Sequence, residues 1–292
     1  MIPPGASPIV GPGTIFKMRT RSFFLLLFAA ALASAQTPPA ITSGGIVNGA
    51  SFQAIPLTPG SLFSIFGSGL ASTTASASTV PFSSNLGGVT VQFVNGSTTI
   101  DARVSYVQPG ADGNSQINAQ VPWELVTPGT SATVNLVVTN NGVPSAPTPV
   151  SIAPFSPAIF GFNTETGIRA IAYNYLDSTF SWPTGSVPGL TTHPAAPGSL
   201  VIAYATGLGA VNQTVADGAP PTALTEANTM PQILIGGITA QVGFAGLSQF
   251  PGVYQLNITV PANAPAGSAV PFQVQVGGIT SPATFTIAVG NP

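Results

Sequence analysis

The stretch PGSLFSIFGSGL at residues 59–70 decides the fold, because it returns as PGSLVIAYATGL at residues 197–208. Three further segments return in the same order: VSY at 104–106 as VGF at 242–244, QINAQVP at 116–122 as QLNITVP at 255–261, and NGVPS at 141–145 as GGITS at 277–281. The offsets between the paired segments are 138, 138, 139 and 136 residues. A nearly constant offset of this length indicates two copies of one domain rather than a short solenoid repeat.

Each copy consists of short runs rich in β-branched and aromatic residues, separated by Gly, Pro and Asn. The run VTVQF at 89–93, for example, alternates apolar and polar residues with the period of a half-buried strand. Asn95-Gly96 follows it, and both residues tolerate the positive φ of a tight hairpin turn. The same reasoning predicts strands at 61–66, 88–94, 100–107, 115–121, 133–139 and 149–152, and again at 200–204, 232–235, 238–244, 253–260, 270–276 and 283–289.

We therefore predict an all-β fold of two tandem immunoglobulin-like β-sandwiches, with almost no helix after residue 35. The predicted bounds are 1–35 for an upstream segment and signal peptide, 36–153 for the first sandwich, 154–196 for an inter-domain hairpin and connection, and 197–292 for the second sandwich. Residues 36–153 are called the first copy below, and residues 197–292 the second copy. The predicted core consists of Leu62, Ile65, Val91, Tyr106, Ile117, Val137, Leu200, Ile202, Val242, Phe244, Leu256 and Val274.

The N-terminal segment has the pattern of an export signal. Met18-Arg-Thr-Arg21 is basic, the ten residues 23–32 are apolar, and Ala33-Ser-Ala35 forms a cleavage site before Gln36. The apolar run is shorter than the about 20 residues of a spanning helix. We therefore expect a protein that is secreted or held at the cell surface, without a stable membrane span after cleavage. An uncleaved anchor is the alternative, and a start at Met18 would explain the dissimilar residues 1–17.

Charged residues make up only 4% of the chain, against about 25% in an ordinary soluble domain. After residue 35 the only cations are Arg103 and Arg169, set against seven acids. A chain with so little positive charge has no field to attract nucleic acid. The absence of Cys excludes a disulfide framework, a thiolate zinc site and a Cys nucleophile.

The order of the repeated motifs resembles the IPT/TIG immunoglobulin-like domain, and more closely the Solibacter-type C-terminal domain of secreted acidobacterial proteins. The matching segments are 48–52, 59–70, 86–89, 116–123, 157–160, 197–209 and 254–261, within roughly residues 41–290. These motifs are structural glycines, prolines and core positions. The resemblance therefore implies an immunoglobulin-like fold and secretion, but no catalytic residue and no ligand. Residues 97–99 lengthen the first hairpin relative to Gly236-Gly237, which departs from a strict repeat.

Catalytic chemistry finds little support in the sequence. His193 is the single His, no Gly-x-Ser-x-Gly elbow is present, and we interpret His193 as a solvated linker residue. The seven acids share no obvious strand face, and single acids in loops do not make a calcium site. We therefore expect no enzyme, no cofactor and no metal site. Trp123-Glu124 has no counterpart in the second copy, which leaves two readings: a role specific to the first copy, or an aromatic residue that caps the core.

Aromatic residues in the segment 154–196 are the best candidates for ligand contact. We predict a ligand-binding site at Tyr173, Tyr175 and Trp182, because flat aromatic faces stack on sugars and small ligands favour domain junctions. The alternative is that these residues fill the joint between the sandwiches.

The predicted function is that of a non-catalytic extracellular module for adhesion, cell-surface assembly or glycan contact. Its partners would be a cell-surface glycan or an envelope protein. A purely structural spacer is the second hypothesis, and a hydrolase that uses carboxylates is the third.

Overall fold

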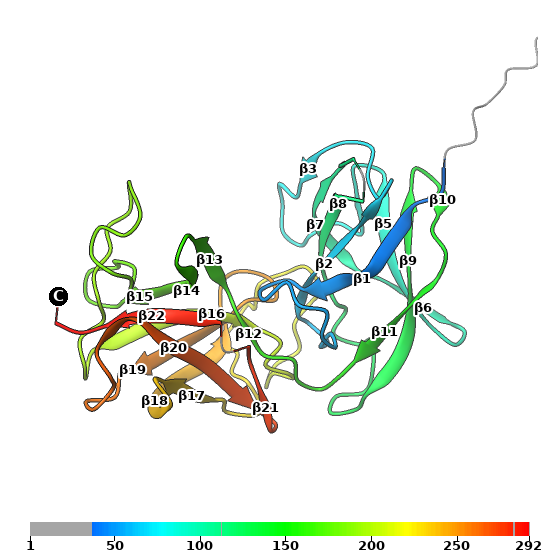
Figure 1. Ribbon diagram of the computed structural model, residues 1–292. Helices are drawn as coiled ribbons and strands as arrows, with labels where there is room; N and C mark the ends of the chain where they lie inside the picture. Colours follow the sequence, from blue (N-terminus) through cyan, green and yellow to red (C-terminus); the bar gives the residue numbers. More distant parts are fainter. Residues whose placement is uncertain (1–36, 112, 283, 292) are drawn as a thin grey trace, which may run out of the picture. The chain divides into compact units, whose positions relative to one another are not determined.

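The computed structural model describes residues 37–111, 113–282 and 284–291, and within them every regular element is a β-strand (Figure 1). The all-β fold class predicted from the sequence is therefore confirmed. The predicted signal segment 18–35 and Asp112 lie outside the described residues. Gln36–Pro292 forms one compact unit. In the described part of the chain, no helix has the length and apolar character to cross a membrane.

The first copy contains two sheets that enclose one hydrophobic cluster. The first sheet has the order β1 (Ala40–Asn48), β2 (Leu62–Ser68), β8 (Ser115–Gln120), β7 (Arg103–Gln108) and β3 (Ala75–Ser76). The second has the order β10 (Val143–Pro144), β9 (Ala132–Asn140), β5 (Val89–Asn95) and β4 (Asn85–Leu86), with β11 (Thr148–Ile152) paired to β9 and β6 (Thr98–Asp101) paired to β5. Strands β1, β2, β8 and β7 occupy the A, B, E and D positions of an immunoglobulin sandwich, and β5, β9 and β11 the C, F and G positions.

The remaining strands form one hydrogen-bonded path around a second hydrophobic cluster. Its order is β12 (Ala158–Ile159), β16 (Leu200–Thr206), β19 (Tyr254–Thr259), β18 (Ile238–Leu247), β17 (Gln232–Ile235), β20 (Gly267–Val276), β22 (Phe285–Val289), β14 (Gly167–Ala170) and β13 (Gly161–Thr164), with β15 (Ala172–Asn174) paired to β16 and β21 (Ile279–Thr280) paired to β20. The long strand β18 pairs with both β17 and β19, and so joins the two layers. The A-B-E-D and C-F-G orders of the first copy thus recur here.

Equivalent side chains make equivalent hydrogen bonds in the two copies. The Ser145 hydroxyl accepts the backbone N–H of Val138 at 3.0 Å, and the Ser281 hydroxyl accepts that of Val274 at 2.9 Å. In both places the serine follows a two-residue turn with positive φ, Asn141-Gly142 and Gly277-Gly278 respectively. The repeated NGVPS and GGITS segments therefore encode a tight hairpin whose serine closes the turn.

The repeated VSY and VGF segments encode a β-bulge. The register of β7 against β8 shifts between Val104 and Tyr106, and that of β18 against β19 shifts between Val242 and Phe244. A bulge places two residues opposite one, so the inward and outward positions exchange after it. This is why Val107, not Tyr106, enters the first core.

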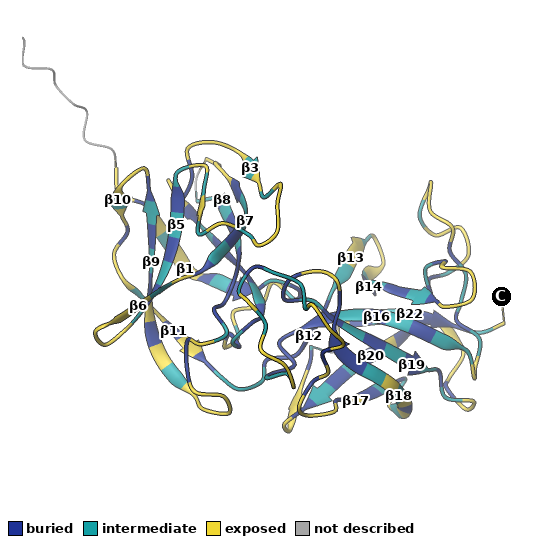
Figure 2. Cartoon of the chain, turned by 180° about the vertical axis from the view of Figure 1, so that it is seen from behind, coloured by how far each residue is buried: buried dark blue, intermediate teal, exposed yellow. Residues whose placement is uncertain are grey.

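Five predicted core residues are buried: Ile65, Val91, Ile117, Leu256 and Val274. The other seven are only half-buried, and their prediction as core residues is wrong: Leu62, Tyr106, Val137, Leu200, Ile202, Val242 and Phe244. In β16 the inward residues are Val201, Ala203 and Ala205, whereas the larger Ile202 and Tyr204 point outward. In this strand the larger side chains are not the buried ones, so side-chain size does not indicate which face of the strand points into the core. Figure 2 shows the resulting alternation of buried and less buried residues along the strands.

The segment 154–196, which the sequence predicts to be an inter-domain hairpin and connection, contains the hairpin of β13 and β14 and also contributes strands to the sheet of the second copy. β15 pairs with β16, and β14 pairs in parallel with the last strand, β22. Arg169 in β14 is buried, and its guanidinium donates hydrogen bonds to the Ser268 carbonyl and to the hydroxyls of Thr166 and Thr286. This segment is thus packed and hydrogen-bonded as part of the fold.

The inward and outward faces of β19 give a test of the corrected strand phase. Leu256→Ala should lower the free energy of unfolding by about 2–5 kcal/mol, because it leaves a cavity in the core. Thr259→Ala, at a half-buried outward position of the same strand, should cost less than about 1 kcal/mol. Urea denaturation measures both values. Equal losses in the two variants would contradict the assigned phase.

Candidate functional site

Two of the three aromatic residues that the sequence placed in one binding site, Tyr173 and Trp182, pack against the same ring, that of Phe180, at centroid distances of 4.4 and 4.3 Å. Trp182 is 1% exposed, and its indole N–H donates to the Ala170 carbonyl at 2.7 Å. Its ring lies between those of Phe180 and Phe162, with centroid distances of 4.3 and 5.8 Å. This burial removes Trp182 from the predicted ligand-binding site. Its contacts with Phe162, Phe180 and Ala170 lie within the segment 154–196 itself, so they do not test the alternative that it fills the joint between the sandwiches. Tyr175 is 56% exposed and Tyr173 is half-buried, so only these two remain accessible.

The single histidine forms an ion pair with Asp177. His193 Nε2 lies 2.6 Å from Asp177 Oδ2, and Nδ1 lies 2.8 Å from the Pro194 carbonyl oxygen. Hydrogen bonds from His193 and from Thr179 lower the pKa of Asp177 to about 2, and the hydrogen bond to Asp177 raises the pKa of His193. The contact of Nε2 therefore joins the turn that contains Asp177 to the segment around His193, whereas Nδ1 contacts the carbonyl of the next residue. We had interpreted His193 as a solvated linker residue, and this pair was not predicted.

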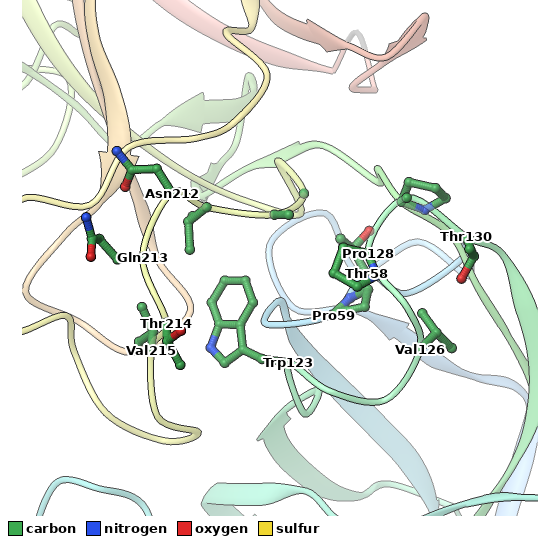
Figure 3. Close-up of a pocket in the computed structure, with 15 residues that line it drawn as sticks. Thr58, Pro59, Trp123, Val126, Pro128, Thr130, Asn212, Gln213, Thr214 and Val215 are labelled. Atoms are coloured by element: carbon green, nitrogen blue, oxygen red, sulfur yellow. The ribbon is translucent and has the colours of Figure 1, made fainter.

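A cavity of about 330 Å³ lies around Trp123 and is the best candidate site in the described chain. Figure 3 shows Trp123 with the segment 212–215 on one side of its ring and with Thr58, Pro59 and Pro128 on the other. Trp123 follows β8 directly, and its ring packs against the hydrophobic cluster of the second copy. The cavity is therefore lined by residues from both copies, as small-molecule sites at domain junctions often are.

Three backbone and side-chain contacts fix Trp123. The indole ring covers Gly60, where an added Cβ would lie 2.3 Å from ring carbons. The backbone N–H of Trp123 donates to Asp217 Oδ1 at 2.9 Å. The buried Gln120 side chain donates to the Gly60 carbonyl at 3.0 Å and accepts the Gly218 N–H at 2.6 Å. Glycine is required at position 60 because the ring leaves no room for a side chain and the backbone φ is +78°.

Two residues that line this cavity each carry a buried polar atom without a hydrogen-bond partner among the described residues: the indole Nε1 of Trp123 and the hydroxyl of Thr58. Both atoms are buried, and Thr58 as a whole is 1% exposed. A buried polar group without a partner costs about 1–3 kcal/mol. The segment that faces Trp123 is accessible, since Asn212, Gln213 and Thr214 are all exposed.

No charged residue lines the cavity, whose polar groups are hydroxyls, amides and the indole N–H. The nearest charges lie behind Trp123. Burial raises the pKa of Asp217 to about 6; nearby Glu124 acts in the same direction, while the Trp123 N–H and Arg103 act against it. Such a cavity favours an uncharged ligand, because a charged one would lose hydration without gaining an ion pair.

The sequence alone marked Trp123 as unusual, since VPWE at 121–124 has no aromatic counterpart at Ala262-Asn263. The sequence left two roles open for Trp123, one specific to the first copy and one of capping the core. In the structure the Trp123 ring both lines a cavity and packs against a hydrophobic cluster. Nothing in the sequence marked residues 209–215, which contribute their backbone and short side chains to the far wall. The pairing of Glu124 with Asp217 was also missed, because the two lie 93 residues apart in different copies.

The chain matches no protein-family model and no curated protein. Among solved structures it is similar to a chimeric titin Z1Z2 that carries an exogenous peptide from decorin, at 14% identity over 88% of this chain and 100% of that chain, with a TM-score of 0.19. It is also similar to the C-terminal domain of the Streptococcus agalactiae AgI/II polypeptide BspA, at 9% identity over 85% and 99% of the two chains, with a TM-score of 0.17. TM-scores this low carry no argument, so the fold assignment depends on the strand order itself.

Gly60 and Gly198 are equivalent positions that differ only in what covers them. Gly198 has φ +81° and nothing within 4 Å of an added Cβ, whereas Trp123 covers Gly60. Gly198→Ala should therefore lower the free energy of unfolding by only about 1–2 kcal/mol, the cost of a left-handed backbone at a residue with a side chain. Gly60→Ala should cost more and should shift the tryptophan fluorescence, because it displaces the Trp123 ring. Equal stability losses with unchanged emission in both variants would refute the contact.

The raised pKa of the half-buried Asp217 predicts a pH dependence of stability. Its folded pKa of about 6 exceeds the ordinary value of 3.8, so the folded state binds this proton more tightly than the unfolded state. The free energy of unfolding should therefore fall as the pH rises from about 4 to 6. Asp217→Asn keeps an acceptor for the Trp123 N–H but should remove this fall, as pH-dependent urea denaturation can measure.

Asp177→Asn is the control, because the pKa of Asp177 is shifted in the opposite direction to that of Asp217. Because the folded pKa of Asp177 is lowered to about 2, its stabilising effect is present above 3.8 and is lost as the pH falls toward 2. A wild-type profile that Asp217→Asn leaves unchanged between pH 4 and 6 would exclude the assigned pKa.

Proposed function

We propose that this chain is an exported, non-catalytic β-sandwich module that binds an uncharged glycan through the cavity around Trp123, in adhesion or cell-surface assembly. The observation that carries the proposal is the composition of the cavity. An indole ring, proline walls, hydroxyls and amides surround a space without any charged side chain. Sugars present an apolar ring face and a polar rim, which an aromatic ring and neutral hydrogen-bonding groups can match.

Export belongs to the same proposal. It is supported by the signal-like segment 18–35 and by the resemblance to secreted acidobacterial domains. A chain with 4% charged residues and no Cys also fits a module whose surface contacts are made by neutral hydrogen bonds. The segment itself lies outside the described residues.

The two unpartnered atoms favour ligand binding over a purely structural spacer. A spacer has no need for a buried indole N–H and a buried hydroxyl that lack partners, since each destabilises the folded chain. A ligand hydroxyl that accepts from Trp123 Nε1 would remove that cost on binding. Binding sites often contain polar groups that destabilise the free protein because they lack partners and that gain hydrogen bonds in the complex.

Hydrolysis by carboxylates is a second candidate with one observation in its favour. Asp217 has a raised pKa beside Glu124, and a carboxyl group with a raised pKa can act as a general acid. One Asp217 oxygen, however, already accepts the Trp123 backbone N–H. Release of reducing sugar that is lost in Asp217→Asn and Glu124→Gln would favour this candidate over binding alone.

Binding to an array of neutral oligosaccharides tests the proposed site. Trp123→Ala should lower the affinity for the bound sugar by at least about tenfold, because it removes both the stacking surface and the indole N–H. Phe52→Ala, which removes an aromatic residue that is 55% exposed and does not line the cavity, should leave the affinity unchanged. Equal affinity in all three proteins would disprove the site.

The Thr58 hydroxyl separates a binding role from a packing role. Thr58→Val should raise the free energy of unfolding by about 1 kcal/mol, because it removes an unpaired buried hydroxyl, and should weaken sugar binding. Thr206 is the matched control: it is also fully buried, but its hydroxyl accepts the Leu62 N–H and donates to the Gly252 carbonyl. Thr206→Val should therefore lower the free energy of unfolding. A loss of stability in Thr58→Val would show that its hydroxyl is satisfied within the protein.

A further inference from the structure

Aromatic side chains lie on the outward face of the sheet formed by β15, β16, β19 and β18. Two hollows of about 430 and 520 Å³ adjoin there and share Tyr204, Gln249 and Phe250. Tyr173 lines the first hollow, and Phe244 lines the second. We call the combined depression the aromatic groove. It crosses four adjacent strands, which corresponds to about 14 Å at a strand spacing of about 4.8 Å.

The strand register places the groove residues in rows on one face. Tyr204 is paired with Gln255, and Phe244 with Asn257, while Tyr173 and Asn257 are both paired with Ile202. The opposite face of the same strands supplies the buried core residues. These aromatic residues are thus not needed to fill the core. An outward sheet face is normally polar, so a row of aromatic residues on it marks an interaction site.

Two amides in the groove present a fixed donor and a fixed acceptor. Gln255 Nε2 donates to Asn257 Oδ1 at 2.8 Å. This contact leaves the carbonyl oxygen of Gln255 as an acceptor and the NH₂ group of Asn257 as a donor, side by side on neighbouring outward positions. Two adjacent hydroxyls of a sugar ring match this arrangement, because one can donate to Gln255 while the other accepts from Asn257.

The first copy has the same four residue types but a different environment. Phe66 is paired with Gln116 and Tyr106 with Asn118, and Gln116 Nε2 donates to Asn118 Oδ1 at 2.8 Å. There, however, Asn118 Oδ1 also accepts the Ser64 hydroxyl, and the ring of Phe52 lies 6.3 Å from that of Phe66. The first copy therefore provides matched control positions.

We propose that the aromatic groove binds an extended, uncharged sugar chain, and so forms a second contact site besides the Trp123 cavity. The ligand class rests on the proposed function, whereas the groove itself is a separate site. No charged residue lines either hollow, which disfavours anionic polymers. The aromatic groove spans four strands, and the rings of Tyr173 and Tyr204 lie edge to face in it, with centroids 6.2 Å apart. This width, the aromatic lining and the oriented amide pair favour several consecutive sugar units over a single one.

Affinity electrophoresis of the purified protein through gels that contain neutral polysaccharides (β-glucan, glucomannan, galactomannan or xylan) tests the groove. Tyr204→Ala and Gln255→Ala should each weaken retention about twofold to tenfold. The matched variants Phe66→Ala and Gln116→Ala in the first copy should be retained like the wild type. Retention should be unchanged between about 0.05 and 0.5 M sodium chloride, since no ion pair is involved. Thermal unfolding verifies that each variant is folded.

The outcomes separate this inference from the proposed function. Retention that is lost in Trp123→Ala but unchanged in Tyr204→Ala would overturn the groove and leave the proposed function standing. Retention lost in Tyr204→Ala and unchanged in Trp123→Ala would support the groove and contradict the cavity. Self-association that Tyr204→Ala abolishes, without retention by any polysaccharide, would overturn the groove as a sugar site and identify this face as an interface between copies of the chain.

Discussion

The buried side chain of Gln120 is the contact on which the arrangement around Trp123 depends. Its amide donates to the Gly60 carbonyl and accepts the Gly218 N–H, so one residue connects the PGS turn of the first copy to a loop of the second copy. Gly60 must then lie beneath the Trp123 ring, and Asp217, next to Gly218, receives the Trp123 N–H. Because these groups are neutral amides and backbone atoms apart from one carboxylate, the junction needs no ion pair. The equivalent residue in the second copy, Thr259, is only half-buried.

Much of the fold could be predicted from the sequence because its information is local. Strand positions follow from alternation and from turn residues, and the repeat supplied each strand a second time. The strand phase was harder to predict. A bulge at Val104–Tyr106 and its counterpart at Val242–Phe244 reverse which residues of the strand point into the core. No residue type in these segments indicates that reversal. In β16, small alanines face the core and a tyrosine faces outward, which reverses the usual relation between size and burial.

The candidate sites were harder to predict than the strands, because they depend on contacts between distant residues. An aromatic cluster in the sequence suggested Tyr173, Tyr175 and Trp182, but Trp182 finds its hydrogen-bond partner in the Ala170 carbonyl and becomes part of the packing. Conversely, the indole N–H of Trp123 is buried without a partner among the described residues, beside a cavity that a loop of the second copy also lines. The state of an indole N–H is thus a property of the tertiary structure. The two tryptophans of this chain illustrate opposite outcomes for one residue type.

The parallel pairing of β14 with β22 has a mechanical consequence. β22 is bonded on one side to β20 and on the other to β14, and its last residues also exchange hydrogen bonds with Ser181 and Ala195. These bonds run across the strand, so a force applied along β22 from the C-terminal end loads them simultaneously in shear. Strands loaded in this way yield together, whereas a hairpin pulled open at its end loses one bond at a time. The strand β22 is therefore held on both sides by bonds that a pull along it would load together.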